Sequence, residues 1–359
     1  MNKKRISIFT SISIAVFSLT TLLLMIARAD RAAADFLDLN ISTPFRRAMA
    51  SVGELTRVSM FEMLVLLLPV IAVAVIALSI RVFSRGYGRT RFVLHIVSIA
   101  LLLYSGNTLA LGISYNTTPI DSRMGLTRTE INADTLRDAM EDLCLEINSL
   151  SDEICYSDGQ SHSGYDLGEL SDRICESYSD FSDEYSYPIS FVSHVKGVDA
   201  LHFMSYLGLT GIYTYYTGES NVNTDYPDYT VTFTSAHELA HQRGILRENE
   251  ANFMAYLICS RSDDPYLRYS AALNMLGYVG NALYRTDRNA YYEVLSTLDS
   301  RALDDMRAAS RVSAEYADTF IADISDFVND LFLKSNGTDG IVTYGRVVTL
   351  YMSYRVSDR

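Results

Sequence analysis

Cysteine is scarce in this chain of 359 residues, which contains only Cys144, Cys155, Cys175 and Cys259. No two of them have the C-x-x-C spacing of a thiolate metal site, so the sequence offers no zinc finger of that type. Cys144 and Cys155 are the only pair close enough in sequence to suggest a disulfide. Buried or helix-face thiols are an equally good interpretation.

Basic residues are few beyond residue 113. Residues 1–113 contain 12 Lys and Arg against 5 Asp and Glu, which leaves 18 against 38 for residues 114–359, a net charge of −20. A surface this acidic stays soluble and repels nucleic acid and anionic lipid headgroups. We therefore expect no nucleic-acid partner. Internal repeats and low-complexity linkers are also lacking, so residues 114–359 read as one domain.

Long apolar runs crowd the first third of the chain, at residues 6–26, 63–80 and 92–113. Each is about the ~20 residues that cross hydrocarbon, so we expect three transmembrane helices in a lipid bilayer. The first run could instead be a cleaved signal peptide. Because it is longer than the usual ~7–15-residue apolar core of such a peptide, we favour a membrane anchor.

The positions of Lys and Arg predict the orientation of these helices. The leader and the loop after the second helix contain basic residues without acids: Lys3, Lys4 and Arg5, then Arg81, Arg85, Arg89 and Arg91. Such flanks are cytoplasmic. The loop at about 27–61 mixes both signs and is the weaker part of the topology. We expect the N-terminus inside, a membrane region at 1–113, and residues 114–359 outside the cytoplasmic membrane.

Helical periodicity dominates the exterior part. Apolar residues recur three or four apart over residues 132–150 and 167–181. The section from 187 to 228, rich in Gly, Tyr and Thr, predicts short extended pieces and turns, and the alternation over 229–234 predicts one strand. Further helices are expected at about 236–243, 249–262, 265–284, 288–298, 301–334 and 342–354. The fold class is therefore mainly α, with a small sheet.

The stretch T-F-T-S-A-H-E-L-A-H-Q-R-G, from Thr232 to Gly244, contains the motif H-E-x-x-H. Residues four apart share one helix face, so His237 and His241 can both present an imidazole to one zinc ion. Glu238 lies beside them as the general base for a water molecule. Gly244 would end the helix and let the chain turn back toward the metal.

The third ligand is expected from the segment that follows, E-N-E-A-N. Glu248 is the first choice. Glu250 remains the alternative, because the loop of only six residues between His241 and Glu248 is tight. Asn252 lies one helical turn after Glu248 and would orient a ligand histidine through its free ring N–H. Two histidines, a glutamate and an open position are what hydrolytic zinc requires.

These motifs resemble a known family. The run S-Y-L-G-L-T-G-I-Y-T-Y-Y-T-G-E-S-N-V-N-T-D (Ser205 to Asp225), the H-E-x-x-H segment and N-G-T-D-G-I-V-T-Y-G-R-V-V near the end are similar to the domain-of-unknown-function 3810 family. The resemblance implies a membrane-spanning N-terminal region and a zincin-like α+β core. The pair Glu248 and Asn252 also resembles the E-x-x-x-D pattern of gluzincin metallopeptidases, with Asn in place of Asp. No substrate is implied.

Other polar residues are weaker candidates. His95, His162, His194 and His202 stand alone in the sequence and are expected to be packing or surface side chains. Tyr344 and Arg346, two residues apart near the C-terminus, are possible contacts to substrate or to the negative charge of a transition state.

Two classes of function remain open at this point. The first is a membrane-anchored zinc hydrolase, a peptidase whose peptide or protein substrate the sequence does not identify. The alternative is a non-catalytic zinc-containing receptor or scaffold, which the same motif would also fit. An intramembrane protease is disfavoured, because the polar cluster from Arg243 to Asn252 could not lie in hydrocarbon.

Overall fold

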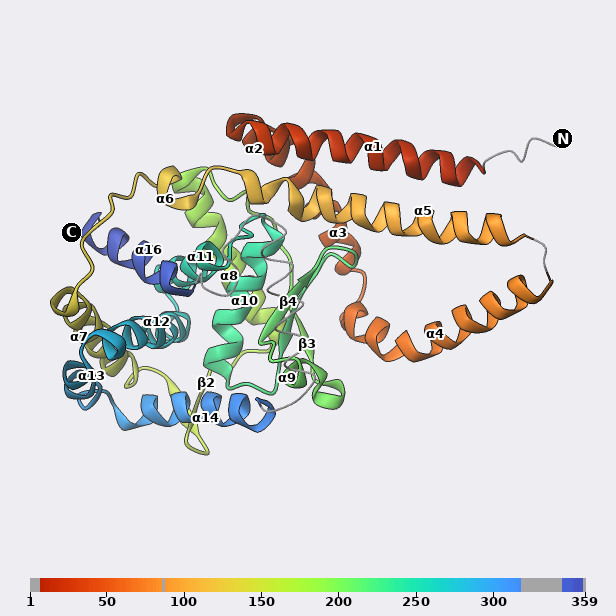
Figure 1. The fold of residues 1–359 in the computed structure, drawn as a ribbon. Helices are drawn as coiled ribbons and strands as arrows, with labels where there is room; N and C mark the ends of the chain where they lie inside the picture. The colour runs from red at the N-terminus through yellow and green to blue at the C-terminus, as the bar shows by residue number, and fades with distance from the viewer. Residues whose placement is uncertain (1–6, 86–87, 318–343, 358–359) are drawn as a thin grey trace. The chain divides into compact units, whose positions relative to one another are not determined.

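The chain folds into two compact units, each described separately below. The computed structural model describes residues 7–85, 88–317 and 344–357. The first unit comprises Met1–Thr118 together with Thr214–Gly218, and the second comprises Pro119–Tyr213 with Glu219–Arg359. Helices make up most of the described chain (Figure 1). The mainly α fold class with small sheets is confirmed.

Three long apolar helices characterise the first unit. The stretches Ile8–Ala29, Met60–Arg85 and Arg89–Asn116 are helices long and apolar enough to cross a membrane, and they coincide with the three predicted spans. In the middle one no residue of its most apolar window is buried. The elements of this unit are α1 (Ile8–Ala29), α2 (Arg31–Leu37), η1 (Asp38–Ser42), α3 (Thr43–Gly53), α4 (Met60–Arg85), α5 (Arg89–Asn107), η2 (Thr108–Gly112) and η3 (Ser114–Asn116).

A buried ion pair lies at the polar centre of the first unit. Arg46 is fully buried and contacts Asp38 at 3.0 Å, while Nη1 of the same arginine donates to Ser114 Oγ at 2.7 Å. Asp38 begins the π-helical turn η1, and Ser114 follows the π-helical turn η2. Such turns have non-standard helix geometry that brings these polar groups together. A buried charge is tolerated because its partner and hydrogen bonds are present.

The second unit contains the acidic part of the chain. Its helices are α6 (Ile120–Arg123), α7 (Ala133–Leu150), α8 (Leu167–Tyr185), η4 (Ala200–His202), α9 (Phe203–Tyr206), α10 (Asp228–Gln242), α11 (Glu248–Ser260), α12 (Pro265–Thr286), α13 (Arg288–Leu295), α14 (Ser300–Tyr316) and α16 (Tyr344–Ser357). Helix α12 packs against α7, α10, α11 and α16 and so lies at the centre of the core. The predicted helices are thus confirmed where they are described, most of them within a few residues, but α10 begins eight residues before the predicted start at 236. The predicted helix at 301–334 is described only as far as residue 317, and the rest of it lies outside the described residues.

Two small sheets complete the second unit. Strands β1 (Cys155–Ser157) and β2 (Gln160–His162) form an antiparallel hairpin. Strands β3 (Lys196–Val198), β4 (Gly211–Thr214) and β5 (Glu219–Asn223) form a sheet in the order β3-β5-β4, with β3 and β5 parallel. The section from 187 to 228 therefore contains short strands, as predicted. In this sheet β4 is an outer strand.

The predicted strand at residues 229–234 is wrong, because this stretch forms the first turns of α10. Every residue from Tyr229 to Ala236 is buried, since β5, α8, α11 and α12 all pack against the helix. A helix that is covered on all sides needs apolar and small residues around its whole circumference. Such a segment cannot be distinguished from a buried strand by its periodicity.

The four cysteines are free thiols, and the suggested pair does not form a disulfide. Cys144 is buried in α7, whereas Cys155 is exposed at the start of β1. Cys175 and Cys259 are also buried. The interpretation of these residues as buried or helix-face thiols therefore holds for three of the four.

Candidate metal centre

The turn between α10 and α11 brings the two helices of the site together. Gly244 has φ of +98°, a backbone conformation that residues with a side chain rarely adopt. Around it, the N–H of Ile245 donates to the carbonyl of Ala240 at 3.0 Å, which closes the end of α10. Three residues later α11 begins at Glu248. The predicted role of Gly244 in reversing the chain is thus confirmed.

Three side chains converge across this turn. Glu248 Oε2 lies 3.3 Å from His237 Nε2, and Glu248 Oε1 lies 3.5 Å from His241 Nε2. Within the described chain, these three residues are the group of His, Cys, Asp and Glu side chains whose ligand atoms all lie within 4.8 Å of one another. One nitrogen from each imidazole and one carboxylate therefore face a common point.

The tautomer of His241 follows from its second ring nitrogen. His241 Nδ1 lies 2.8 Å from the carbonyl oxygen of Ile245. Because a carbonyl can only accept, Nδ1 carries the proton and Nε2 keeps its lone pair in the neutral ring. A histidine fixed in this way is ready to bind a metal through Nε2.

Electrostatics couple Glu248 to the histidines. Burial would raise the pKa of Glu248, but the nearby rings of His241 and His237 lower it well below its usual range. Burial also lowers the pKa of His241, yet Glu248 outweighs this effect and raises it to about 9. In the metal-free protein the carboxylate is thus balanced by a protonated imidazole, whose proton a metal ion would have to displace.

Glu238 lies beside this cluster in a nearly closed environment. Only 4% of the surface of Glu238 is exposed. Its Oε2 atom has no hydrogen-bond partner in the part of the chain that the structure describes. Burial raises the pKa of the Glu238 carboxyl, while His237 and His241 oppose the shift. A buried carboxylate oxygen without a partner is unfavourable unless water or a ligand meets it.

Strand β4 contacts Glu238 from the side of the sheet. The backbone of Tyr213 hydrogen-bonds to the carboxylate. A Cβ atom built on Gly211 would lie 2.5 Å from Glu238 Oε1 and equally close to Thr234 Cγ2, so only glycine leaves room there. Neither Gly211 nor Tyr213 was predicted from the sequence as part of the site. The only hint was that both belong to a Gly- and Tyr-rich section expected to contain short strands.

The alternative third ligand is turned elsewhere. Glu250 is buried, and both of its carboxylate oxygens contact Arg247 Nη1, at 3.0 and 3.1 Å. Asn252 is also buried, but among the described residues it makes no hydrogen bond to His237 or His241. The orienting partner of His241 is instead the carbonyl of Ile245. A backbone partner of this kind leaves no signal in the choice of side chain.

Arg346 and the two arginines near the motif, Arg243 and Arg247, face other surroundings than the three converging side chains. Arg346 is exposed and lines a different cavity, while the side chain of Tyr344 lies outside what is described. Arg243 is fully buried, with its guanidinium 4.4 Å from the ring centroid of Tyr178, and donates to the carbonyl of Phe191 at 2.6 Å. Arg243 is therefore part of the packed interior of the second unit. Arg247 is paired with Glu250.

The remaining histidines do not join a metal cluster among the described residues. Each of those in the second unit pairs with an aspartate: His162 with Asp228, His194 with Asp172 and His202 with Asp225. His95 makes an edge contact with the ring of Phe9. These four histidines are therefore surface or packing side chains, as their isolation in the sequence predicted.

The donor set of the cluster suits zinc. Two imidazole nitrogens and one carboxylate oxygen are the ligand types that zinc accepts at catalytic sites, where three protein ligands leave a position open. The unpartnered Glu238 oxygen beside them is consistent with such a position. The residues present therefore fit a zinc ion.

Comparison with known proteins assigns the chain to a family whose function is not known. Neither a curated protein nor a solved structure matches it significantly. The family described as "Protein of unknown function (DUF3810)" matches residues 41–352, which include most of both units. The chain is a member of the DUF3810 family.

Proposed function

We propose that this protein is a membrane-anchored zinc hydrolase, a peptidase that acts outside the cytoplasmic membrane. The observation that carries the proposal is the convergence of His237, His241 and Glu248 on one point, beside the buried carboxylate of Glu238. A zinc ion held by the three ligands would supply a Lewis acid that polarises a carbonyl and lowers the pKa of water.

The chain's own residues would perform the proton transfers. Glu238 would accept a proton from the attacking water and deliver it to the leaving amine. Its pKa, which burial raises, makes the carboxylate a better base than an exposed glutamate and allows it to return the proton. The free oxygen of Glu238 is the one available for this transfer.

Strand β4 is suited to bind an extended peptide. It is an outer strand of its sheet, and its residues Gly211 and Tyr213 adjoin Glu238. An extended substrate can add to such an edge through main-chain hydrogen bonds, which do not depend on sequence. The strand predicted at residues 229–234 forms part of α10 instead, so β4 is the strand that adjoins Glu238.

The proposal is tested on the full-length protein in detergent. We expect wild type to retain about one zinc ion per chain and His237→Ala to lose it, measured by elemental analysis. Glu238→Gln should keep zinc and lose peptide hydrolysis by about 10²-fold or more. A wild type that carries as little zinc as His237→Ala would overturn the proposal.

The same variant separates the enzyme from a zinc-containing receptor or scaffold. If cells with Glu238→Gln behave like cells with the gene deleted, hydrolysis is the function. If they behave like wild type although the deletion has a phenotype, the protein works without catalysis. Proteins that accumulate in both the deletion and the Glu238→Gln cells are then candidate substrates.

A further inference from the structure

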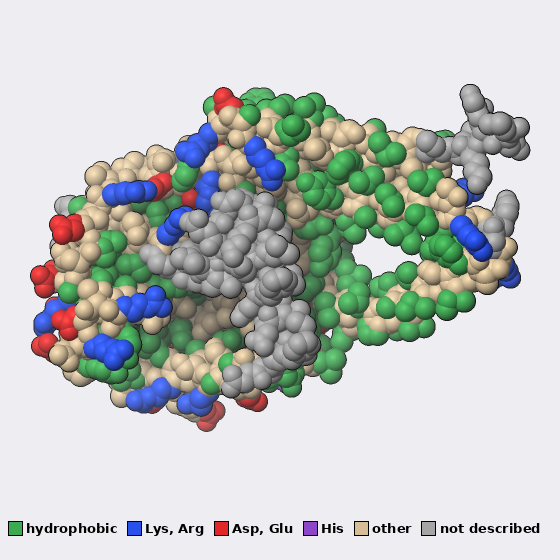
Figure 2. All heavy atoms as spheres, in the orientation of Figure 1, with side chains coloured by type: hydrophobic (Ala, Val, Ile, Leu, Met, Phe, Trp, Pro, Cys, Tyr) green, Lys and Arg blue, Asp and Glu red, His purple; other side chains and the backbone are tan. Residues whose placement is uncertain are grey.

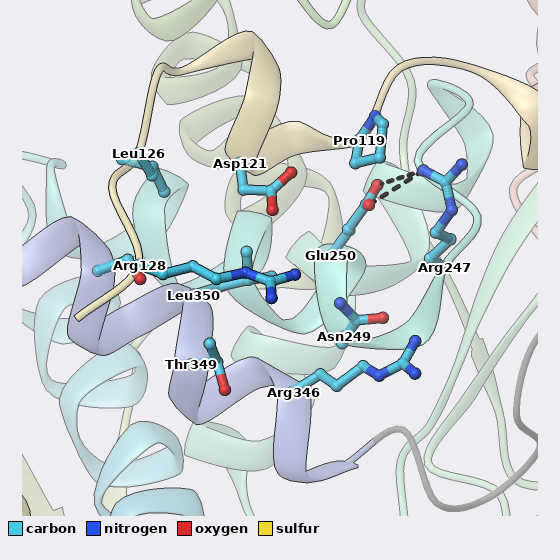
Figure 3. A pocket seen from close by; sticks show the side chains of 11 residues that line it. Pro119, Asp121, Leu126, Arg128, Arg247, Asn249, Glu250, Arg346, Thr349 and Leu350 are labelled. Atoms are coloured by element: carbon cyan, nitrogen blue, oxygen red, sulfur yellow. Dashed lines mark hydrogen bonds and ion pairs between the residues drawn. The ribbon is translucent and has the colours of Figure 1, made fainter. Parts of the chain in front are cut away.

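A cavity in the second unit lies apart from the metal-ligand cluster. Its volume is about 540 Å³, and its walls come from the segment around α6, the first turn of α11 and the helix α16 (Figure 3). None of His237, His241 and Glu248 lines it. Asn249 and Glu250, which directly follow Glu248, do line it, so successive residues of α11 serve two different sites.

Three arginines from three elements line this cavity. Arg128 follows α6, Arg247 immediately precedes α11 and Arg346 belongs to the first turns of α16. Two carboxylates, those of Asp121 and Glu250, line it as well. The formal balance of the wall is therefore +1, in a part of the chain whose net charge is −20. Because the sign of the charge is locally reversed, an anion is attracted to the cavity and repelled by the acidic surface around it.

The two carboxylates are already engaged. Glu250 contacts Arg247 through both oxygens and also accepts a hydrogen bond from the backbone of Ile120. Asp121 accepts from the backbone N–H of Ser122 at 2.7 Å. In contrast, Arg128 makes no hydrogen bond or ion pair with any described residue, and in Figure 3 its guanidinium extends into the cavity.

The other wall residues suit a small organic ligand. Leu126, Leu350 and Pro119 give apolar surface, and the amide of Asn249 and the hydroxyl of Thr349 give hydrogen-bonding groups. On α16 the spacing of Arg346, Thr349, Leu350 and Ser353 places them on one helix face toward the cavity. A ligand with an anionic end and a short apolar part would match both kinds of wall.

We propose that this cavity binds a small organic oxyanion, a carboxylate or phosphate with a short apolar chain, held by Arg128 and Arg346. Guanidinium groups bind both types of oxyanion in a bidentate manner. The site does not depend on the proposed hydrolytic activity, because none of the metal-ligand residues contributes to it.

Equilibrium dialysis with the full-length protein in detergent tests the site. The probes are N-acetyl-leucine, its neutral isostere N-acetyl-leucinamide and inorganic phosphate, at constant ionic strength. We expect saturable binding of N-acetyl-leucine and at least about tenfold weaker binding of the amide, because only the carboxylate can pair with the arginines. Competition between phosphate and N-acetyl-leucine shows whether the apolar chain contributes to binding. Tighter binding of N-acetyl-leucine than of phosphate supports contact between the chain and the apolar part of the wall.

Matched variants locate the binding. Arg128→Gln with Arg346→Gln should weaken N-acetyl-leucine binding at least about tenfold. Arg285→Gln changes an exposed arginine outside the cavity and should leave the binding unchanged. Arg128 and Arg346 are both exposed, and thermal unfolding of the double variant checks that it is folded. Equal binding by the double variant, equal binding of the amide, or no saturable binding of N-acetyl-leucine or phosphate below about 10 mM would each overturn the proposal.

Discussion

Glu248 and Glu250 lie only two residues apart on α11, yet their side chains have entirely different surroundings. Successive side chains turn by about 100°, so these two point in nearly opposite directions. Glu248 faces the imidazoles of His237 and His241, whereas Glu250 faces Arg247. The sequence could supply both acids but could not choose between them, because the start of α11 sets which one faces α10.

The choice of third ligand leads to a first prediction. Glu248→Ala should lose zinc, because only two protein ligands remain. Glu250→Ala should keep zinc at the wild-type ratio, although the loss of a buried partner for Arg247 lowers stability by roughly 1–3 kcal/mol. Elemental analysis and thermal unfolding of the two purified variants check both parts. Retention of zinc by Glu248→Ala and its loss in Glu250→Ala would reverse the assignment.

Gly211 gives a second prediction at the same scale. In Gly211→Ala the new Cβ would lie 2.5 Å from Glu238 Oε1, so the carboxylate must move from its position near the metal ligands. We expect peptide hydrolysis to fall while zinc remains bound, together with a destabilisation of about 1–3 kcal/mol from overpacking.

The control for this variant is a glycine in open space. Gly277 lies within α12, and a Cβ built there would meet no atom within 4 Å. Gly277→Ala should therefore leave hydrolysis unchanged and stabilise the helix by roughly 0.5–1 kcal/mol. If both alanine variants lost activity to the same degree, the contact with Glu238 would not be the cause.

At the scale of elements, α10 marks where prediction from the sequence succeeded and where it failed. Helix periodicity placed His237 and His241 on one face, and the turn at Gly244 brought back the acid that follows it, so the sequence predicted the convergence of these three side chains. The first turns of α10 were misassigned because full burial removes the polar face that identifies a helix. Strand β4 was missed as the neighbour of Glu238, since a four-residue strand carries little pattern and its pairing is set by contacts distant in sequence.

The loop between β4 and β5 gives an element-scale prediction. Gly218 has φ of +73°, and a Cβ on it would lie 2.0 Å from the carbonyl oxygen of Met49 in α3. A backbone atom cannot move aside cheaply, so Gly218→Ala should separate this loop from α3 and lower the thermal midpoint strongly. Unfolding of the full-length protein in detergent measures the effect.

Gly208→Ala distinguishes the steric clash from the backbone conformation. Gly208 has φ of +67°, but a Cβ there would meet nothing within 4 Å. Both variants experience the penalty of a left-handed residue, about 1–2 kcal/mol, and only Gly218→Ala adds the clash. Equal loss of stability in the two variants would show that the contact with Met49 has no energetic weight.

At the scale of the whole molecule, apolar and charged side chains are divided between the two units. Figure 2 shows hydrophobic side chains along the long helices of the first unit, and charged side chains over the helices of the second. Exposed apolar side chains are numerous on α1, α4 and α5, which an aqueous environment would not favour. The basic residues between α4 and α5 are the basis of the predicted orientation, in which the second unit lies outside the cytoplasmic membrane.

Cysteine labelling tests this orientation, because only one native thiol is accessible. Cys144 and Cys259 are buried, and burial raises the pKa of Cys144 to about 11 and that of Cys259 further still, so neither forms a reactive thiolate. Cys175 is buried as well, whereas Cys155 is exposed. A membrane-impermeant maleimide should therefore label one site per chain in right-side-out membrane vesicles, and Cys155→Ser should abolish the label.

A single reporter on the other side of the membrane completes the test. Ser84 is exposed at the end of α4, next to the basic loop that is predicted to be cytoplasmic. In the Cys155→Ser background, Ser84→Cys should be labelled only after the vesicles are permeabilised, since the reagent cannot cross the bilayer. Three crossings require the two positions to lie on opposite sides. Labelling of both positions in sealed vesicles would remove α5 as a membrane span, because α5 is the long apolar helix between them. The reverse pattern would place the second unit in the cytoplasm.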